Sequence, residues 1–173
     1  MVIIVIKAII YNSHTGFTKQ YAYHFAINTG LPIYDIKEAK KKLNKGDEII
    51  YFSWLKANKI TKLNKMKNYK IAYIAAVGMS FYNDDLISDI KKINKFENIY
   101  YLQGGIRWRM LNTFERILMK MILASLRKKN KKNLLNAEDK VFYDRLNNGY
   151  EIIDLNSLNH LIMWYNSSNE LIS

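Results

Sequence analysis

Short apolar runs alternate with amphipathic stretches along the chain. The run from Val2 to Tyr11 is rich in β-branched residues and almost entirely apolar, which is typical of a parallel strand buried on both faces of a sheet. From about Gly16 to Asn28, apolar side chains recur at helical spacing, and Thr29-Gly30 ends this stretch. Alternation of strands and helices predicts an α/β fold with a parallel sheet.

Four further strands are predicted after the first. We expect them at Leu31 to Tyr34, Glu48 to Ser53, Tyr69 to Val77 and Asn98 to Leu102. Because crossovers between parallel strands are right-handed and short, we predict a doubly wound, five-stranded parallel sheet of order 2-1-3-4-5 with helices on both faces.

Helix signals fall between these strands. Asp35 and Glu38 form a capping-box pair that opens a short, Lys-rich helix. A modest helix is expected at about Lys59 to Met66, and Asn83 can cap another whose first turn is acidic.

The region after the fifth strand is unusually long. Gly104 to about Asn148 exceeds an ordinary connection and is predicted as an insertion. A short strand at Tyr150 to Asp154 and a final helix at Leu155 to Tyr165 are expected to follow. Since no linker rich in Pro, Gly or Ser divides the 173 residues, we predict a single domain over residues 1–173.

Composition narrows the chemistry. The chain has no cysteine, and its three histidines lack ligand spacing, so disulfides are excluded and no metal site is expected. Any redox activity must therefore use a bound cofactor. The apolar runs are too short or too interrupted for a transmembrane helix, and no signal cleavage site follows Lys7, so we expect a cytoplasmic protein.

The most informative motif follows the first strand directly. It reads Ser13-His14-Thr15-Gly16-Phe17-Thr18 and leads into a helix. Its hydroxyls, with backbone amides around Gly16 at the helix N-terminus, form a nest for phosphate oxygens without a lysine. Neither a Walker-type Gly-Lys-Ser/Thr ending nor a Gly-x-Gly-x-x-Gly motif is present. An ordinary helix cap with extra hydroxyls is the alternative interpretation.

This loop resembles the first loop of the flavodoxin family, which reads Ser/Thr-x-Thr-Gly-x-Thr directly after the first strand. The resemblance in fold order covers roughly residues 2 to 103 and the final helix. It implies non-covalently bound flavin mononucleotide (FMN), with its phosphate on Ser13, His14, Thr15, Gly16, Phe17 and Thr18. A solvent-facing spacer is the alternative role of His14.

In that family, two further loops hold the flavin ring at the carboxyl ends of the third and fourth strands. The corresponding segments are Ser53-Trp54-Leu55-Lys56-Ala57-Asn58 and Ala76-Val77-Gly78-Met79-Ser80. Trp54 is expected to stack on the ring, because an indole offers area and π contact, and Gly78 to let backbone amides reach the pyrimidine edge. Alternatively, Trp54 fills a gap over the sheet, and Gly78 only ends a strand.

The charge of the chain points to a binding surface on the insertion. The chain has 27 basic and 15 acidic residues, a net charge of +12, which implies anionic neighbours; a general bias toward Lys, Asn and Ile is the alternative explanation. A helix over about 109–128, opened by Asn112 and Glu115, is predicted to have a basic face of Arg109, Arg116, Lys120 and Arg127. Its apolar face is predicted to comprise Leu111, Phe114, Leu118, Met121 and Ile122.

Such a helix suits an anionic membrane surface on the inner face of the membrane, or a protein partner. A core-packing helix with a solvated polar face has the same pattern. Nucleic-acid binding is less favoured, because aromatic residues do not interleave with the basic ones.

The insertion, with its segment Phe114-Glu115-Arg116-Ile117-Leu118-Met119-Lys120, makes the chain similar to the flavodoxin-type, quinone-dependent protoporphyrinogen oxidase subfamily. That resemblance implies an FMN-dependent oxidoreductase that converts protoporphyrinogen to protoporphyrin, with a membrane-associated quinone as acceptor. No side chain is assigned as catalytic acid or base. The alternatives are a non-enzymatic electron-transfer flavodoxin that docks through a basic surface, and a flavin-free binding or regulatory protein of the same fold.

Overall fold

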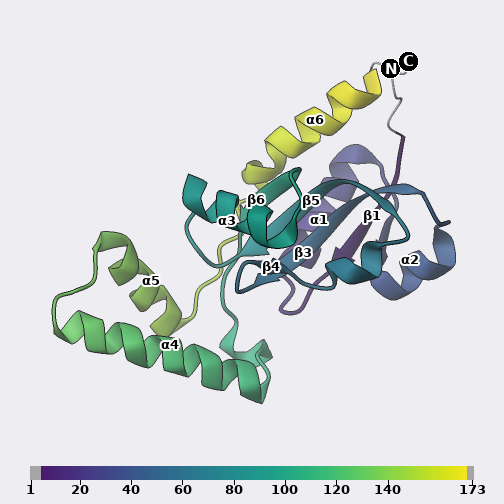
Figure 1. Cartoon of the computed structure of the whole chain (residues 1–173). Coiled ribbons are helices and arrows are strands. Elements are labelled where there is room, and N and C mark those ends of the chain that lie inside the picture. The colour runs from purple at the N-terminus through teal and green to yellow at the C-terminus, as the bar shows by residue number, and fades with distance from the viewer. Residues whose placement is uncertain (1–4, 171–173) are drawn as a thin grey trace.

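The computed structural model of the chain describes residues 5 to 170, so Val2 to Ile4 of the expected first strand lie outside the described residues. Strands and helices alternate through the first part of the chain (Figure 1). In order, they are β1 (Ile6–Asn12), α1 (Phe17–Thr29), β2 (Ile33–Asp35), α2 (Ile36–Lys42), β3 (Glu48–Lys56), β4 (Lys59–Ile60), the 3-10 turn η1 (Leu63–Met66), β5 (Lys70–Gly78), α3 (Asp84–Asn94) and β6 (Ile99–Gln103).

The sheet is parallel along the order β2-β1-β3-β5-β6, and the short β4 pairs antiparallel with β3. This numbering differs from the expected order 2-1-3-4-5, because the sequence analysis did not predict β4. The structure thus has an α/β fold with a parallel sheet flanked by helices.

The prediction of a helix at Lys59 to Met66 was wrong, because Lys59 and Ile60 form β4. Ala57 and Asn58 both have positive φ angles, of 47° and 61°, and these two residues close a tight hairpin between β3 and β4. The backbone N–H and the hydroxyl of Thr61 both donate to the carbonyl of Trp54, at 3.1 and 2.8 Å. Only η1 remains helical in this region.

Both faces of the sheet are covered. Ile9 belongs to the core cluster under α1 and the C-terminal segment, whereas the next residue, Ile10, belongs to the cluster under α2 and α3. Consecutive strand residues point to opposite faces, so burial of both explains why the expected first strand is apolar throughout. The expected caps of α2 and α3, Asp35 and Asn83, are confirmed.

The insertion forms a helical hairpin that extends beside the sheet (Figure 1). It comprises the 3-10 turn η2 (Trp108–Met110), α4 (Thr113–Lys131) and α5 (Ala137–Asn148), and η3 (Leu155–Leu158) and α6 (Asn159–Glu170) follow it. The prediction of a strand at Tyr150 to Asp154 was wrong, because this segment forms only an isolated antiparallel bridge, between Tyr150 and Ile106. None of the described helices is both long and apolar enough to cross a bilayer.

Candidate functional site

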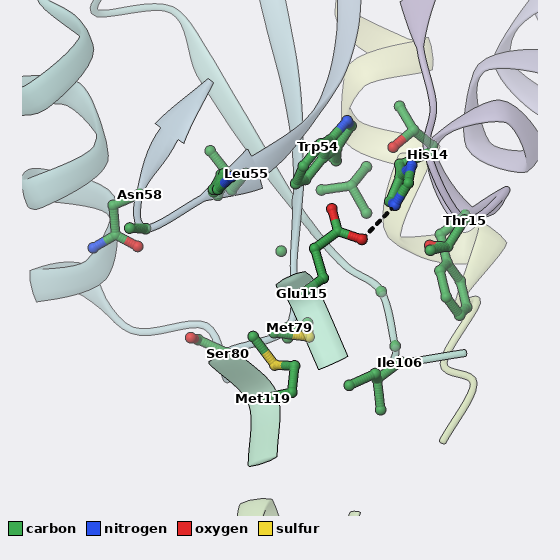
Figure 2. Close-up of a pocket in the computed structure, with 18 of the residues that line it drawn as sticks. His14, Thr15, Trp54, Leu55, Asn58, Met79, Ser80, Ile106, Glu115 and Met119 are labelled. Carbon is green, nitrogen blue, oxygen red and sulfur yellow. Dashed lines mark hydrogen bonds and ion pairs between the residues drawn. The ribbon is translucent and has the colours of Figure 1, made fainter. Parts of the chain in front are cut away.

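A cavity of about 490 Å³ lies at the carboxyl ends of the parallel strands, with α4 beside it (Figure 2). Its size is within the usual range for sites that hold a small molecule or cofactor, and crevices at this edge are where doubly wound sheets bind ligands. The lining comes from the loop after β1, the end of β3 and its hairpin, the loop after β5, the segment after β6, and α4.

Most of the residues expected to bind FMN line this cavity. They are His14, Thr15, Phe17, Thr18, Trp54, Leu55, Lys56, Ala57, Val77 and Gly78, together with the neighbouring Asn58, Met79 and Ser80. Ser13, Gly16, Ser53 and Ala76 do not line it. Ser53 is fully buried and donates to the Thr61 carbonyl at 2.9 Å, and Ala76 lies in the core, so both have structural positions.

The loop after β1 brings the N-terminus of α1 to the cavity wall. Gly16 has a φ of 93°, a left-handed conformation that glycine adopts without steric cost. Its N–H donates to the hydroxyl of Ser13 at 3.2 Å. No side-chain cap satisfies the first turn of α1, whereas α2, α3, α4 and α5 each have an Asp or Asn cap. The amides of this turn are therefore available to an anion.

Arg107 reaches the same loop from the segment after β6. Its Nη1 donates to the Thr15 carbonyl at 2.7 Å, while Nε and Nη2 donate to the two carboxylate oxygens of Glu151, both at 2.8 Å. The guanidinium also lies over the ring of Phe17, 4.3 Å from its centroid. A Cβ on Gly16 would lie 2.8 Å from Nη1. Arg107 therefore holds the loop after β1 in place through Thr15, Gly16 and Phe17.

The bidentate pair shifts both of its titrating groups. The hydrogen bonds with Glu151 raise the pKa of Arg107, and the same contacts lower the pKa of Glu151. Both groups are therefore charged across the ordinary pH range. The sequence analysis did not assign Arg107, because no local motif connects it to a carbonyl 92 positions away.

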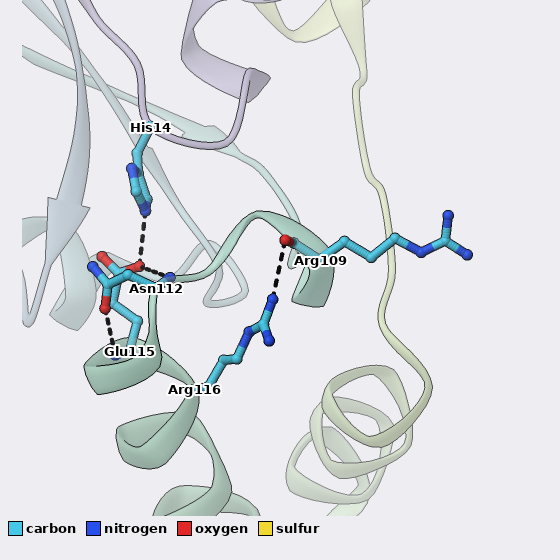
Figure 3. A network of polar contacts seen from close by, with 5 residues as sticks. All are labelled: His14, Arg109, Asn112, Glu115 and Arg116. Carbon is cyan, nitrogen blue, oxygen red and sulfur yellow. Dashed lines mark hydrogen bonds and ion pairs between the residues drawn. The ribbon is translucent and has the colours of Figure 1, made fainter.

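His14 links the loop to the insertion (Figures 2 and 3). Its Nε2 lies 2.8 Å from Oε2 of Glu115 in α4, and its ring stacks on Trp54 with centroids 5.4 Å apart and planes inclined by 26°. His14 is exposed, and it nevertheless contacts both Glu115 and Trp54. The contact fastens the start of α4 beside the cavity.

Glu115 is held at several points. Its Oε2 accepts from the Asn112 N–H at 3.0 Å, and its own N–H donates to Asn112 Oδ1 at 2.9 Å, which confirms the expected capping box (Figure 3). Burial by itself would raise the pKa of Glu115, but the hydrogen bonds from Asn112 and His14 outweigh it, and the pKa is lowered. The carboxylate is therefore ionised near neutral pH.

Buried Tyr101 and half-buried Tyr150 position the loop after β5. The hydroxyl of Tyr101 donates to the Ser80 carbonyl at 2.6 Å, and that of Tyr150 donates to the Met79 carbonyl at 2.7 Å. Burial raises the pKa of both, that of Tyr150 to about 12. A Cβ on Gly78 would lie 2.8 Å from the ring and hydroxyl of Tyr101, so only glycine fits there without displacement.

The chemistry available in the cavity is limited. Apart from His14, Lys56 and Glu115, its lining is mainly apolar or hydroxyl-bearing, and the described residues contain no group of His, Asp and Glu side chains that could hold a metal ion. The lining thus combines hydroxyls of Thr15 and Thr18 beside the start of α1 with aromatic and apolar side chains of Trp54 and α4.

Comparison with models of known protein families finds none that matches this chain. A search among curated proteins finds no match either.

Proposed function

We propose that this chain is a flavodoxin-like protein that binds FMN in the cavity beside α4 and acts as an oxidoreductase. One observation carries the proposal. A single cavity is lined by residues of all three loops that the flavodoxin resemblance assigns to FMN, although these loops are separate in the sequence. Their convergence at the carboxyl edge of a parallel sheet is the arrangement that nucleotide cofactors use in doubly wound folds.

The phosphate end fits an anion. The first turn of α1 lacks a side-chain cap, and Thr15 and Thr18 line the cavity beside it. Gly16 adds no side chain to the loop, and the Arg107 guanidinium, which is paired with Glu151, packs against it and donates to the Thr15 carbonyl. A phosphate would find amides, hydroxyls and the positive end of a helix dipole together.

The ring end fits a flat aromatic group. Trp54 provides a large aromatic surface in the cavity, and the ring of His14 stacks on it. Gly78 lines the cavity at the opposite loop, and Tyr101 packs so closely against it that a Cβ would lie 2.8 Å from the tyrosine ring. Stacking together with backbone amides suits a ring that is apolar on its faces and polar at one edge.

Bound FMN supplies one-electron and two-electron transfer chemistry. The chain would bind and orient the cofactor, and α4 contributes Leu118, Met119 and Ile122 as an apolar wall of the cavity. This wall favours an enzyme with a substrate compartment over a plain electron carrier. On the resemblance, we extend the proposal to protoporphyrinogen as substrate and a quinone as acceptor.

Removing two hydroxyls tests the phosphate end. Thr15→Val with Thr18→Val preserves side-chain shape but removes two hydrogen-bonding groups from the cavity wall, so the Kd for FMN should rise at least about tenfold, at about 1 kcal/mol per lost hydrogen bond. Thr29→Val, at the far end of α1, removes a hydroxyl that bonds only the Phe25 carbonyl and is the matched control.

Fluorescence titration with FMN measures the Kd of the double variant, the control and the unmodified chain. Equal FMN affinities for the double variant, the control and the unmodified chain would remove the loop from the proposal. Loss of affinity in the double variant alone would support it.

A further inference from the structure

The outward side of α4 carries a strip of exposed apolar side chains. Phe114, Ile117 and Met121 are 66%, 53% and 64% exposed, and none of the 19 residues of α4 is buried. Their spacings of three and four place them on one side of the helix over two turns. We call these three residues the outer strip.

The outer strip does not line the cavity, and α5 does not bury it. The cavity is lined by a different side of α4, which carries Leu118, Met119 and Ile122. The prediction of a single apolar face was therefore wrong. Leu111, Leu118 and Ile122 line the cavity. Phe114 and Met121 are instead exposed together with Ile117. The hairpin lies beside the sheet (Figure 1), and the three side chains are exposed, with Lys56 Nζ over the ring of Phe114 at 5.8 Å from its centroid.

Basic side chains flank the outer strip. Of the predicted basic face, Arg116, Lys120 and Arg127 lie along the adjacent side of α4 with Lys131, and all four are exposed. Including Arg109 in this face was wrong, because Arg109 lies in η2, before α4 begins. The whole chain carries a net charge of +12. A second copy of this chain would bring like charges together at the strip, and a nucleic acid offers no apolar phase for the three side chains. An anionic bilayer offers both complements.

We propose that α4 docks this protein on an anionic lipid surface. The outer strip enters the boundary between headgroups and acyl chains, and the basic flank contacts lipid phosphates. This inference does not depend on FMN. Because the adjacent side of α4 lines the cavity, docking brings the cavity wall to the lipid surface, where lipid-soluble ligands are concentrated.

Vesicle binding of the full chain tests the proposal. Binding to vesicles of equal parts phosphatidylglycerol and phosphatidylcholine is compared with binding to pure phosphatidylcholine by co-sedimentation. Ile117→Ser with Met121→Ser should lower the partition coefficient at least about tenfold. The matched control is Ile27→Ser with Met163→Ser, which are 80% and 63% exposed on α1 and α6, and it should bind like the unmodified chain.

The charge contribution has its own matched pair. Lys120→Gln, Arg127→Gln and Lys131→Gln together should lower the partition coefficient by about fivefold for each residue. Lys41→Gln, Lys45→Gln and Lys65→Gln remove the same charge from exposed positions elsewhere and should have much less effect.

Several results would overturn the proposal. These are failure of the unmodified chain to bind the anionic vesicles, equal loss in strip and control variants, and concentration-dependent dimerisation that the strip variant abolishes without a change in vesicle binding. Retained FMN affinity in a strip variant that no longer binds vesicles would separate this surface from the cofactor site.

Discussion

Alanine at Gly16 should damage the site, whereas alanine at Gly30 should cost only local stability. Both glycines flank α1 with positive φ angles, of 93° and 70°, so a side chain at either adds backbone strain of about 1–2 kcal/mol. A Cβ at Gly30 meets nothing within 4 Å, and its cost ends there. A Cβ at Gly16 would lie 2.8 Å from Nη1 of Arg107.

The Arg107 guanidinium cannot move freely, because it donates to the Thr15 carbonyl and to both carboxylate oxygens of Glu151. Displacing it costs at least one hydrogen bond from a charged group, about 1.5 kcal/mol. Gly16→Ala should therefore lose about 3 kcal/mol of unfolding free energy, against about 1–2 kcal/mol for Gly30→Ala. Urea unfolding measures this difference.

Cofactor affinity separates the two variants further. Gly16→Ala moves the loop that we propose holds the phosphate, and its Kd for FMN should rise at least about tenfold, or about 1.4 kcal/mol. Gly30→Ala should bind FMN like the unmodified chain. Equal stability losses together with equal FMN affinities would refute the roles given to Gly16 and Arg107.

Further variants test other parts of the account. Trp54→Leu should raise the Kd for FMN by about two- to tenfold, because an aromatic stack contributes about 0.5–1.5 kcal/mol; titration at constant pH measures it. Glu115→Gln weakens the capping box and the contact with His14 and should cost about 1 kcal/mol at pH 7 in urea unfolding. Because the folded-state pKa of Glu115 is lowered from 4.5, its contribution to stability is complete above that unfolded value and lost as pH falls through the folded value, so the two proteins should converge in strong acid. Ile90→Ala, at a fully buried position of α3, should cost about 2–5 kcal/mol of unfolding free energy without changing FMN affinity.

Local signals in the sequence predicted much of the fold. The strands that became β1, β3, β5 and β6 are apolar because residues such as Ile9 and Ile10 are buried on opposite faces. Helix caps depend on residues three positions apart, and the pairs Asp35–Glu38 and Asn112–Glu115 both form as expected. Such short-range chemistry is visible without a structure.

Features that depend on tertiary contacts or unusual backbone were missed. The β3–β4 hairpin needs Ala57 and Asn58 in the left-handed conformation. Alanine rarely adopts this conformation, so the residue types do not predict the hairpin. The partners of His14 and Thr15 lie 101 and 92 positions away, at Glu115 and Arg107. Periodicity marked one apolar face on α4, but only packing divides it into a side that lines the cavity and a side that is exposed.

Whether the chain binds FMN is measured by its visible absorption spectrum, recorded on the purified chain after incubation with FMN and removal of free flavin. Our account predicts a retained two-band flavin spectrum at about one FMN per chain, and its loss in the variant with Thr15→Val and Thr18→Val. A chain that remains colourless after this reconstitution would contradict the account and favour a flavin-free binding role for the cavity.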